Sequence, residues 1–219
     1  MKILVGGIKG GSGKTTIATN LTVIRSSVGK KILLTDADEQ KSASSWSQQR
    51  EIEGIETPWT TIQLSGSAIR NQIQKMAKDY DDIIIDVGGR DTTSQRSALT
   101  IADIFIIPFQ PRSLDIWTLG QVKTLIADVL AINPFLVCIG VINRGDSQGN
   151  DNNEALEILN DCPNLMCSPP TICQRKAFAN AATDGLGVIE MKNKDQKAIS
   201  EIMSLHALIC QNDSKKISK

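Results

Sequence analysis

The sequence has no surplus of either charge and no long hydrophobic run. Among its 219 residues, Lys and Arg together number 24, and Asp and Glu also number 24. This balance excludes a histone-like polycation, although it does not exclude a local basic patch, because net charge does not describe how charges are distributed. No uncharged apolar run approaches the ~18 residues that a membrane-spanning helix needs. We therefore expect no such helix.

Paired cysteines and catalytic histidines are also lacking. The five cysteines are widely spaced and form no Cys-x-x-Cys pair, which favours a reduced chain with buried or incidental thiols. The apolar start, Ile3 to Ile8, is too short and too rich in glycine to be a signal peptide. We therefore expect a soluble, cytoplasmic protein. The single histidine, His206, is expected to be a surface or structural residue rather than a catalytic one.

Short apolar segments alternate with longer amphipathic segments along the whole chain. Runs that are apolar throughout, such as residues 83–85 and 104–107, are typical of strands buried on both faces. The alternation predicts an α/β fold with a doubly wound, mostly parallel sheet flanked by helices. We expect one domain over residues 1–212 and a flexible tail over 213–219. The expected strands are 2–6, 31–36, 60–64, 82–87, 104–109, 135–143 and 165–167, and the expected helices are 14–28, 41–53, 67–78, 93–101, 114–131, 152–160, 174–183 and 194–210.

A glycine-rich segment, Lys9-Gly10-Gly11-Ser12-Gly13-Lys14-Thr15-Thr16, follows the first expected strand. Its end matches the phosphate loop G-x-x-x-x-G-K-[ST], in which backbone N–H groups surround the β-phosphate, the lysine neutralises phosphate charge and the hydroxyl ligates Mg²⁺. Ile8 takes the place of the first glycine, so the strict pattern fails at one residue. The context is appropriate, because a strand precedes the loop and the following helix directs its positive N-terminus at the phosphates.

A second lysine, Lys9, opens this loop. It cannot easily reach phosphates that its own backbone surrounds, so we expect it to extend toward the nucleotide of a neighbouring protomer. The pattern Lys-Gly-Gly-x-Gly-Lys-Thr-Thr resembles the deviant Walker A box of the ParA/MinD family of P-loop ATPases. In that family the leading lysine contacts the partner's phosphates in an ATP-bound sandwich dimer. The resemblance implies ATP and Mg²⁺ as cofactors, a homodimer with ATP, catalytic roles for Lys9 and Lys14, and ATP binding by Lys9, Gly10, Gly11, Ser12, Gly13, Lys14, Thr15 and Thr16.

Two aspartates end the second expected strand. Asp36 and Asp38 are alternate residues, so they share one side of an extended chain, and ligands bind at the carboxyl ends of strands in open α/β sheets. The segment from Asp36 to Gln40 resembles the D-x-D-P-Q box of the family, with Glu39 in place of proline. The resemblance implies that Asp38 is catalytic by orienting the attacking water and that Asp36 supports the Mg²⁺ shell. Two surface aspartates are the alternative.

A third acidic site follows the run Ile83-Ile84-Ile85, which is typical of a Walker B strand. Asp86 can hold the hydration shell of Mg²⁺ opposite Thr15. The family usually continues with Asp-x-Pro-Pro, whereas Gly88-Gly89-Arg90 stands here. Glycine permits close approach of a backbone N–H to the γ-phosphate. The details of γ-phosphate sensing and the role of Arg90 stay open.

Two later segments support the resemblance. Asn143-Arg144 resembles the base-contacting N-R segment of the family, which implies that both residues bind ATP and that the Asn143 amide reads adenine. A turn residue at a strand end is the alternative for Asn143. Residues 106–115 resemble the strand and P-x-x-P-like turn that follow Walker B, and residues 169–172 are candidates to flank the base.

Basic residues near the C-terminus form a candidate DNA-binding strip. Residues 175–181 resemble the R-x-x-F-x-x-A helix near the DNA face of ParA-like dimers. Contacts of Lys and Arg with phosphates give affinity without sequence information, and dimerisation doubles a weak patch without new contacts. A solvated basic face is the alternative. The candidate DNA-binding residues are Arg175, Lys176, Lys192, Lys194 and Lys197.

The resemblance is greatest to the small ParA/ParF-like partition ATPases, because the phosphate loop begins at Lys9 and leaves no room for an N-terminal helix-turn-helix. It implies an ATPase whose dimer binds nonspecific DNA, associates with the nucleoid and hydrolyses ATP when a centromere-binding or adaptor protein stimulates it. One alternative is a MinD-like or cluster-positioning ATPase that acts on a membrane or a protein cargo. Residues 195–210 fit a core-packing helix better than a membrane-binding one. A metabolic ligase on the same fold would need a separate substrate site, and an iron-cluster protein would need bridging cysteines.

Overall fold

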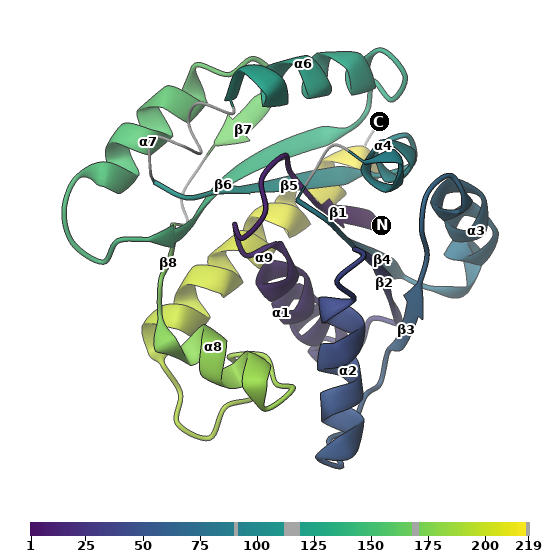
Figure 1. Ribbon diagram of the computed structural model, residues 1–219, viewed down its shortest axis with the longest axis vertical. Helices are drawn as coiled ribbons and strands as arrows, with labels where there is room; N and C mark the ends of the chain where they lie inside the picture. The colour runs from purple at the N-terminus through teal and green to yellow at the C-terminus, as the bar shows by residue number, and fades with distance from the viewer. Residues whose placement is uncertain (90–91, 112–118, 168–170, 218–219) are drawn as a thin grey trace.

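The computed structural model describes residues 1–89, 92–111, 119–167 and 171–217. Its strands and helices alternate as the sequence predicts (Figure 1). The strands are β1 (Lys2–Val5), β2 (Ile32–Ala37), β3 (Thr60–Gln63), β4 (Asp82–Val87), β5 (Ile104–Phe109), β6 (Val137–Gly145), β7 (Leu165–Cys167) and β8 (Ile172–Cys173). The helices are α1 (Lys14–Ser27), α2 (Ser42–Ile52), α3 (Ala68–Met76), α4 (Thr93–Leu99), α6 (Leu119–Leu130), α7 (Asp151–Asn160), α8 (Lys176–Thr183) and α9 (Gln196–Ile217), with a short 3₁₀ helix at Ala77–Asp79.

The sheet is parallel and doubly wound. Its strands lie in the order β3-β2-β4-β1-β5-β6-β7, and β8 pairs with β6. Every pairing within the described residues is parallel. The chain moves outward from β1 in both directions, so the loops that follow β1, β2 and β4 open at the same edge of the sheet. These loops carry the candidate phosphate-binding and acidic residues.

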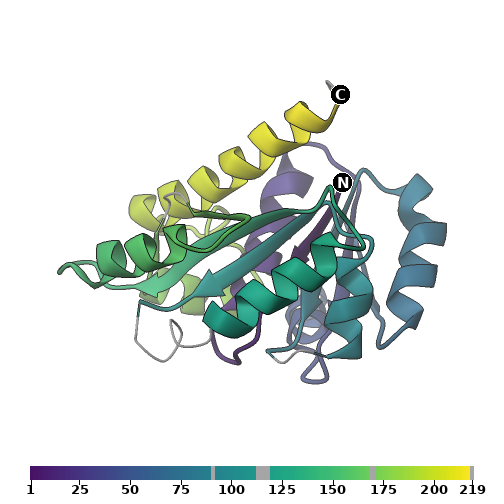
Figure 2. The same cartoon turned by 90° about the horizontal axis from the view of Figure 1, so that it is seen from above.

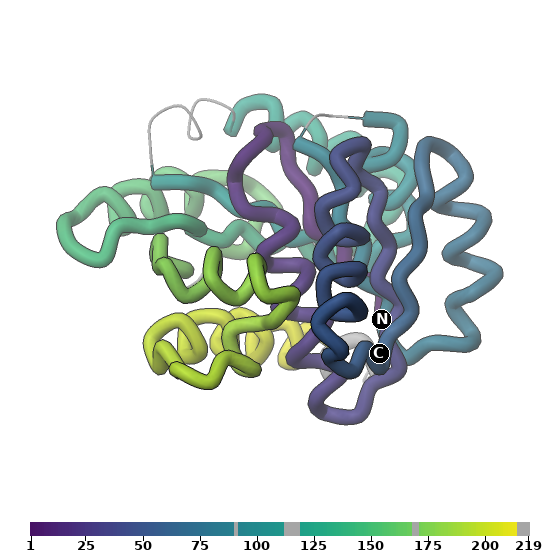
Figure 3. The backbone as a smooth tube through the Cα atoms, turned by 60° about the horizontal axis from the view of Figure 1, so that its bottom comes forward, coloured from purple at the N-terminus to yellow at the C-terminus, as the bar shows by residue number. Residues whose placement is uncertain are grey.

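Helices cover both faces of the sheet. Alternate residues of one strand enter different cores: Ile84 packs with α1, α2, α8 and α9, whereas Ile83 and Ile85 pack with α3, α4, α6 and α7. Figure 2 shows α6 and α9 on opposite sides of the strands. Figure 3 shows α1 and α2 running side by side on their common face. This two-sided burial explains why the central strands are apolar throughout.

Some predicted boundaries are wrong. Residues 174 and 175 precede α8 instead of belonging to it, because β8 pairs with β6 and Arg175 keeps an extended backbone (φ −121°, ψ 139°). Phe135 is 77% exposed and lies before β6, which begins at Val137. Helix α9 continues past Cys210 to Ile217, since no glycine or proline follows to end it. Residues 114–118 of one predicted helix lie outside the described residues.

Two further expectations concern membranes and the lone histidine. Within the described part of the chain, no helix is both long and apolar enough to cross a membrane. His206 lies on α9, with Nε2 3.5 Å from Sγ of Cys210. Burial lowers the pKa of His206, and the nearby Arg25 charge acts in the same direction. The division into a domain over 1–212 and a flexible tail over 213–219 stays a prediction.

Candidate functional site

A cavity of about 1360 Å³ opens at the carboxyl ends of β1, β2 and β4. It collects the loops in which the sequence predicts the phosphate, magnesium and water sites. A cavity of this size is large enough for a nucleotide. Its walls are formed by residues 8–11, 13–16, 36–42, 63–66, 88–89 and 92–94 and by Arg144.

The glycine-rich loop turns sharply from β1 into α1. Gly11 (φ 77°) and Gly13 (φ 86°) both have left-handed backbone conformations, which residues with a Cβ rarely adopt. Gly13 precedes α1 and its carbonyl accepts the N–H of Ile17. A Cβ on Gly13 would lie 2.2 Å from Nδ2 of Asn143, so this position excludes any side chain. The first N–H groups of α1 therefore face the cavity, as a phosphate site requires.

The two lysines of the loop are in different environments. Lys14 is 6% exposed, and its Nζ donates to the carbonyl of Lys9 at 2.9 Å. Lys9 is half-buried on the cavity wall. The contact of Lys9 with a second protomer stays a prediction.

The three predicted aspartates converge at the cavity. Asp36 on β2 is in register with Asp86 on β4, and Asp38 follows directly. Asp36 is 2% exposed, and its Oδ2 accepts the N–H of Ser44 at 2.7 Å. Asp38 is half-buried and faces Gly88, where an added Cβ would lie 3.3 Å from Oδ1 of Asp38. The sequence therefore predicted correctly that these carboxylates lie together.

Asp86 and Thr15 form the polar centre of the site. The Thr15 hydroxyl donates to Oδ2 of Asp86 at 2.7 Å. Asp86 is fully buried, and its Oδ1 accepts no hydrogen bond from the described residues. Burial raises the pKa of Asp86 to about 7, and the hydrogen bond from Thr15 opposes this shift.

These groups fit a magnesium ion. Mg²⁺ usually keeps several waters and binds through one or two carboxylates together with substrate phosphates. The described residues contain no group of three or more His, Cys, Asp or Glu side chains able to hold a metal by themselves. The orphaned carboxylate oxygen of Asp86 and the adjacent hydroxyl of Thr15 match this sparse coordination.

The loop after β4 packs tightly against the glycine-rich loop. A Cβ on Gly89 would lie 2.4 Å from both N and Cα of Gly10, so only glycine fits there. The two loops are thus in backbone contact. Arg90 lies outside the described residues, as do residues 112–115 and 169–170 of the two supporting segments.

Three side-chain amides hold the glycine-rich loop from neighbouring elements. Gln95 on α4 accepts the N–H of Gly7 at 2.7 Å. Gln110 after β5 donates to the carbonyl of Gly11 at 3.1 Å, and Asn143 on β6 donates to the carbonyl of Ser12 at 2.6 Å. The sequence does not predict the contacts of Gln95 and Gln110, because no spacing signal connects them to a loop so distant in the chain. Arg144 is exposed on the cavity wall with a positive φ of 54°.

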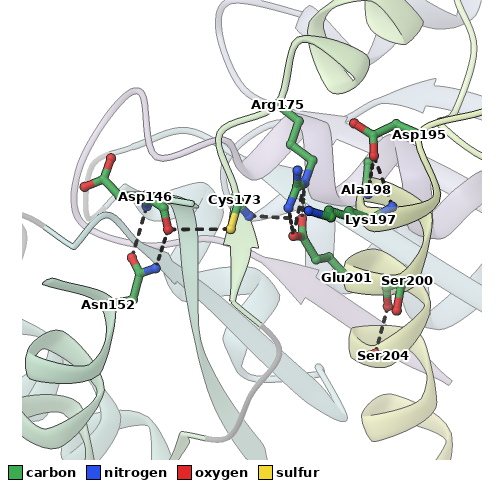
Figure 4. A network of polar contacts seen from close by, with 10 residues as sticks. All are labelled: Asp146, Asn152, Cys173, Arg175, Asp195, Lys197, Ala198, Ser200, Glu201 and Ser204. Carbon is green, nitrogen blue, oxygen red and sulfur yellow. Dashed lines mark hydrogen bonds and ion pairs between the residues drawn. The ribbon is translucent and has the colours of Figure 1, made fainter. Parts of the chain in front are cut away.

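The candidate DNA-binding residues divide into two groups. Lys176, Lys192, Lys194 and Lys197 are exposed on α8, on α9 and on the segment between them. Arg175 instead forms an ion pair with Glu201 of α9, with Nε 3.0 Å from both carboxylate oxygens (Figure 4). Glu201 also accepts the N–H of Cys173 at 3.1 Å. Arg175 therefore ties the start of α8 to α9, and its charge is already compensated.

Comparisons with known proteins agree with this geometry. Residues 3–188 match the model described as the CobQ/CobB/MinD/ParA nucleotide binding domain. Maintenance of carboxysome distribution protein A of Halothiobacillus neapolitanus is 25% identical over 204 residues, which cover 91% of this chain and 92% of that protein. The structure of a variant of Cyanothece McdA in complex with ATP has a TM-score of 0.75 at 15% identity, with 95% of each chain covered. A putative plasmid partition protein of Borrelia burgdorferi B31, bound to AMPPNP, has a TM-score of 0.71 at 21% identity, with 98% of each chain covered.

Proposed function

This chain belongs to the CobQ/CobB/MinD/ParA family of nucleotide-binding domains, and we propose that it is an ATP-dependent DNA-partition ATPase. ATP would join two copies into a dimer, the dimer would bind nonspecific DNA on the nucleoid, and hydrolysis would release it. One observation carries the proposal: Lys14, Thr15 and Asp86 meet at a cavity of about 1360 Å³ beside a glycine loop that opens a helix.

The glycine loop and α1 would bind the phosphates of ATP. Backbone N–H groups of residues 10–16 would surround them, and the Lys14 ammonium would neutralise their charge after leaving the carbonyl of Lys9. Thr15 and Asp86 would hold Mg²⁺, with Asp36 supporting its hydration shell. Bound Mg²⁺ supplies neutralisation of the charge that develops on the β- and γ-oxygens.

Hydrolysis would depend on Asp38. Its carboxylate is half-buried at the cavity and close to Gly88, in the loop that follows Asp86. A carboxylate in this position can accept a hydrogen bond from water and orient it for attack on the terminal phosphate. Lys9 of a second copy would add positive charge to the phosphates, which makes the dimer the hydrolytic form.

DNA binding would use the exposed lysines Lys176, Lys192, Lys194 and Lys197. Each ammonium can contact a DNA phosphate without reading sequence. A single set of four is weak, and a dimer presents two sets on one particle, which raises the effective affinity. We propose that Arg175 contributes less than the lysines, because Glu201 already pairs with it. A centromere-binding or adaptor protein would stimulate hydrolysis and so reverse the binding.

Positioning of a protein assembly is a second candidate function. The relative from Halothiobacillus neapolitanus, which is named for carboxysome distribution, aligns over 91% of this chain. This candidate shares the ATP-dependent dimer and the DNA contact and differs only in the cargo. Identification of the adaptor protein would separate the two functions.

The first experiment is a DNA-binding titration of purified protein across a salt series. Nonspecific duplex DNA is titrated with ATP–Mg²⁺, with ADP–Mg²⁺ and without nucleotide. We expect binding only with ATP, with an affinity that falls steeply as salt increases. Lys14→Ala serves as the nucleotide-binding control. Equal binding in all three nucleotide states, or none in any of them, would refute the proposed switch.

A further inference from the structure

Asn143 has a contact that differs from the base-reading role its position implies. Its side chain is 4% exposed, and Nδ2 donates to the carbonyl oxygen of Ser12 at 2.6 Å. Asn143 is on β6 and Ser12 is in the glycine-rich loop, so the bond joins segments that are distant in the chain. We propose that Asn143 is a positioning residue for the phosphate loop and contributes equally to the binding of any nucleoside triphosphate. The inference rests on the proposed nucleotide site.

The contact fixes the direction of one backbone N–H group. A peptide unit is planar and trans, so the carbonyl of Ser12 and the N–H of Gly13 point in opposite directions. Asn143 holds that carbonyl on the side of β6, and the N–H of Gly13 must therefore point away from β6. Phosphate loops bind anions through N–H groups held in this way. The amide thus acts on the phosphates through the Ser12–Gly13 peptide.

Asn143 and Gly13 also fit together sterically. The Nδ2 atom occupies the place of a side chain on Gly13, where a Cβ would be only 2.2 Å away. Asn143 itself is held from both sides, because β6 pairs with β5 along residues 137–142 and Asn143 pairs with Ile172 of β8. An anchor must be more rigid than the loop it holds, and a residue between two neighbouring strands meets that need.

Adenine recognition by an amide makes a different demand. A bidentate contact needs the oxygen and the nitrogen of the amide to face the base together. In this structure the nitrogen faces Ser12, and the side chain is almost completely buried. Reading the base would therefore require Asn143 to release the phosphate loop.

The test compares ligands that share phosphates but differ in the base. Dissociation constants of ATP, GTP and inorganic tripolyphosphate are measured with Mg²⁺ by competition against a fluorescent ATP analogue. The proteins are wild type, Asn143→Ala and the matched control Gln110→Ala, which removes the neighbouring amide from the carbonyl of Gly11. Thermal unfolding without ligand gives the folded fraction used in each titration.

We expect Asn143→Ala to weaken all three ligands by the same factor, about tenfold for one buried hydrogen bond, and to leave the ratio of ATP to GTP affinity unchanged. Gln110→Ala should give the same uniform pattern with a smaller factor, since its contact is exposed. Asn143→Ser, which retains a polar side chain too short to reach Ser12, replaces Asn143→Ala if the latter does not fold.

Two results would overturn the assignment. One is a loss confined to ATP, with GTP and tripolyphosphate unaffected, which would make Asn143 a base reader. The other is no change for any ligand. A wild-type protein that binds neither nucleotide would instead refute the proposed nucleotide site, so the two failures are distinguishable.

Discussion

Arg25 on α1 and Asp82 at the start of β4 form a buried ion pair, with Nε and Oδ2 2.6 Å apart. The pair lies at the end of β4 opposite Asp86. Oδ1 of Asp82 also lies 3.3 Å from the amino group of Met1. The carboxylate of Asp82 thus compensates charges on two other segments in the interior.

Removal of this carboxylate should destabilise the fold strongly. Asp82→Ala leaves the Arg25 guanidinium buried without its partner, and we expect the free energy of unfolding to fall by roughly 3–5 kcal/mol. Equilibrium urea denaturation measures it. Lys2→Ala is the control, because it breaks a half-exposed ion pair with Asp103 and should cost less than about 1 kcal/mol. Equal losses in the two variants would contradict the structural role of Asp82.

Asp38 should be needed for hydrolysis and not for nucleotide affinity. We expect Asp38→Ala to lower the ATP turnover number by about 10²–10⁴-fold, the usual range for loss of a group that handles the attacking water. The dissociation constant of ATP should change by less than about threefold, because Asp38 would act mainly in the transition state. Phosphate release and ATP titration give the two values. Glu51→Ala, an exposed acidic residue of α2, is the control, and wild-type turnover in Asp38→Ala would exclude this role.

Lys9 and Lys14 should have separable roles. We expect Lys9→Ala to bind ATP as a monomer, whereas Lys14→Ala should lose nucleotide binding, because Lys14 is buried at the phosphate loop. Sedimentation velocity with ATP–Mg²⁺ reports the dimer, and Lys30→Ala at the exposed far end of α1 is the matched control. ATP-dependent dimers of Lys9→Ala with wild-type stability would disprove the proposed contact between protomers.

The exposed lysines should determine the salt dependence of DNA binding. When Lys176, Lys192, Lys194 and Lys197 are replaced by alanine, the slope of log K against log salt should fall by about 0.9 for each DNA phosphate that is no longer neutralised. Arg175→Ala should change this slope much less and should lower stability instead, because it leaves Glu201 unpaired. The control variant, Lys75→Ala with Lys78→Ala, changes exposed lysines at α3. A slope that falls only in Arg175→Ala would reverse the assignment.

The buried thiols should make the protein less stable in alkali. Burial raises the pKa of Cys138 to about 12 and that of Cys167 to about 11, from an ordinary value near 9. The native state therefore favours the neutral thiols, and their contribution to stability is complete below about pH 9 and is lost as the pH rises toward 12. Urea denaturation from pH 8 to pH 11 should show this loss, and Cys138→Ala should make it shallower. Rapid alkylation of Cys138 at pH 8 without denaturant would contradict its burial.

The sequence predicts the sheet and the phosphate loop because both depend on local patterns. Continuous apolar runs such as Ile83–Ile85 predict a buried strand, and the glycines and lysines of residues 9–16 predict a phosphate loop by their order alone. The Asp36 and Asp86 side chains could be placed together because strand ends in a parallel sheet meet at one edge. Local chemistry was thus sufficient wherever the chain direction set the geometry.

Contacts between distant side chains could not be predicted. Gln95 and Gln110 carry no pattern that connects them with the loop they hold. The ion pair of Arg175 with Glu201 depends on how α8 and α9 pack, and the two-residue strand β8 is too short to leave a periodic signal. The sequence therefore identified the chemical groups of the site and missed the side chains that orient them.

Helix α1 and strand β4 are joined at both of their ends. Thr15 meets Asp86 beside the cavity, and Arg25 meets Asp82 at the far end. The helix, the strand and these two contacts form a closed quadrilateral, so α1 cannot slide along β4 without separating both pairs of atoms at once. Rearrangement on nucleotide exchange is then confined to segments attached to this frame, such as the turns that carry Asp38 and Gly89. A superposition on α1 and β4 would measure that rearrangement directly.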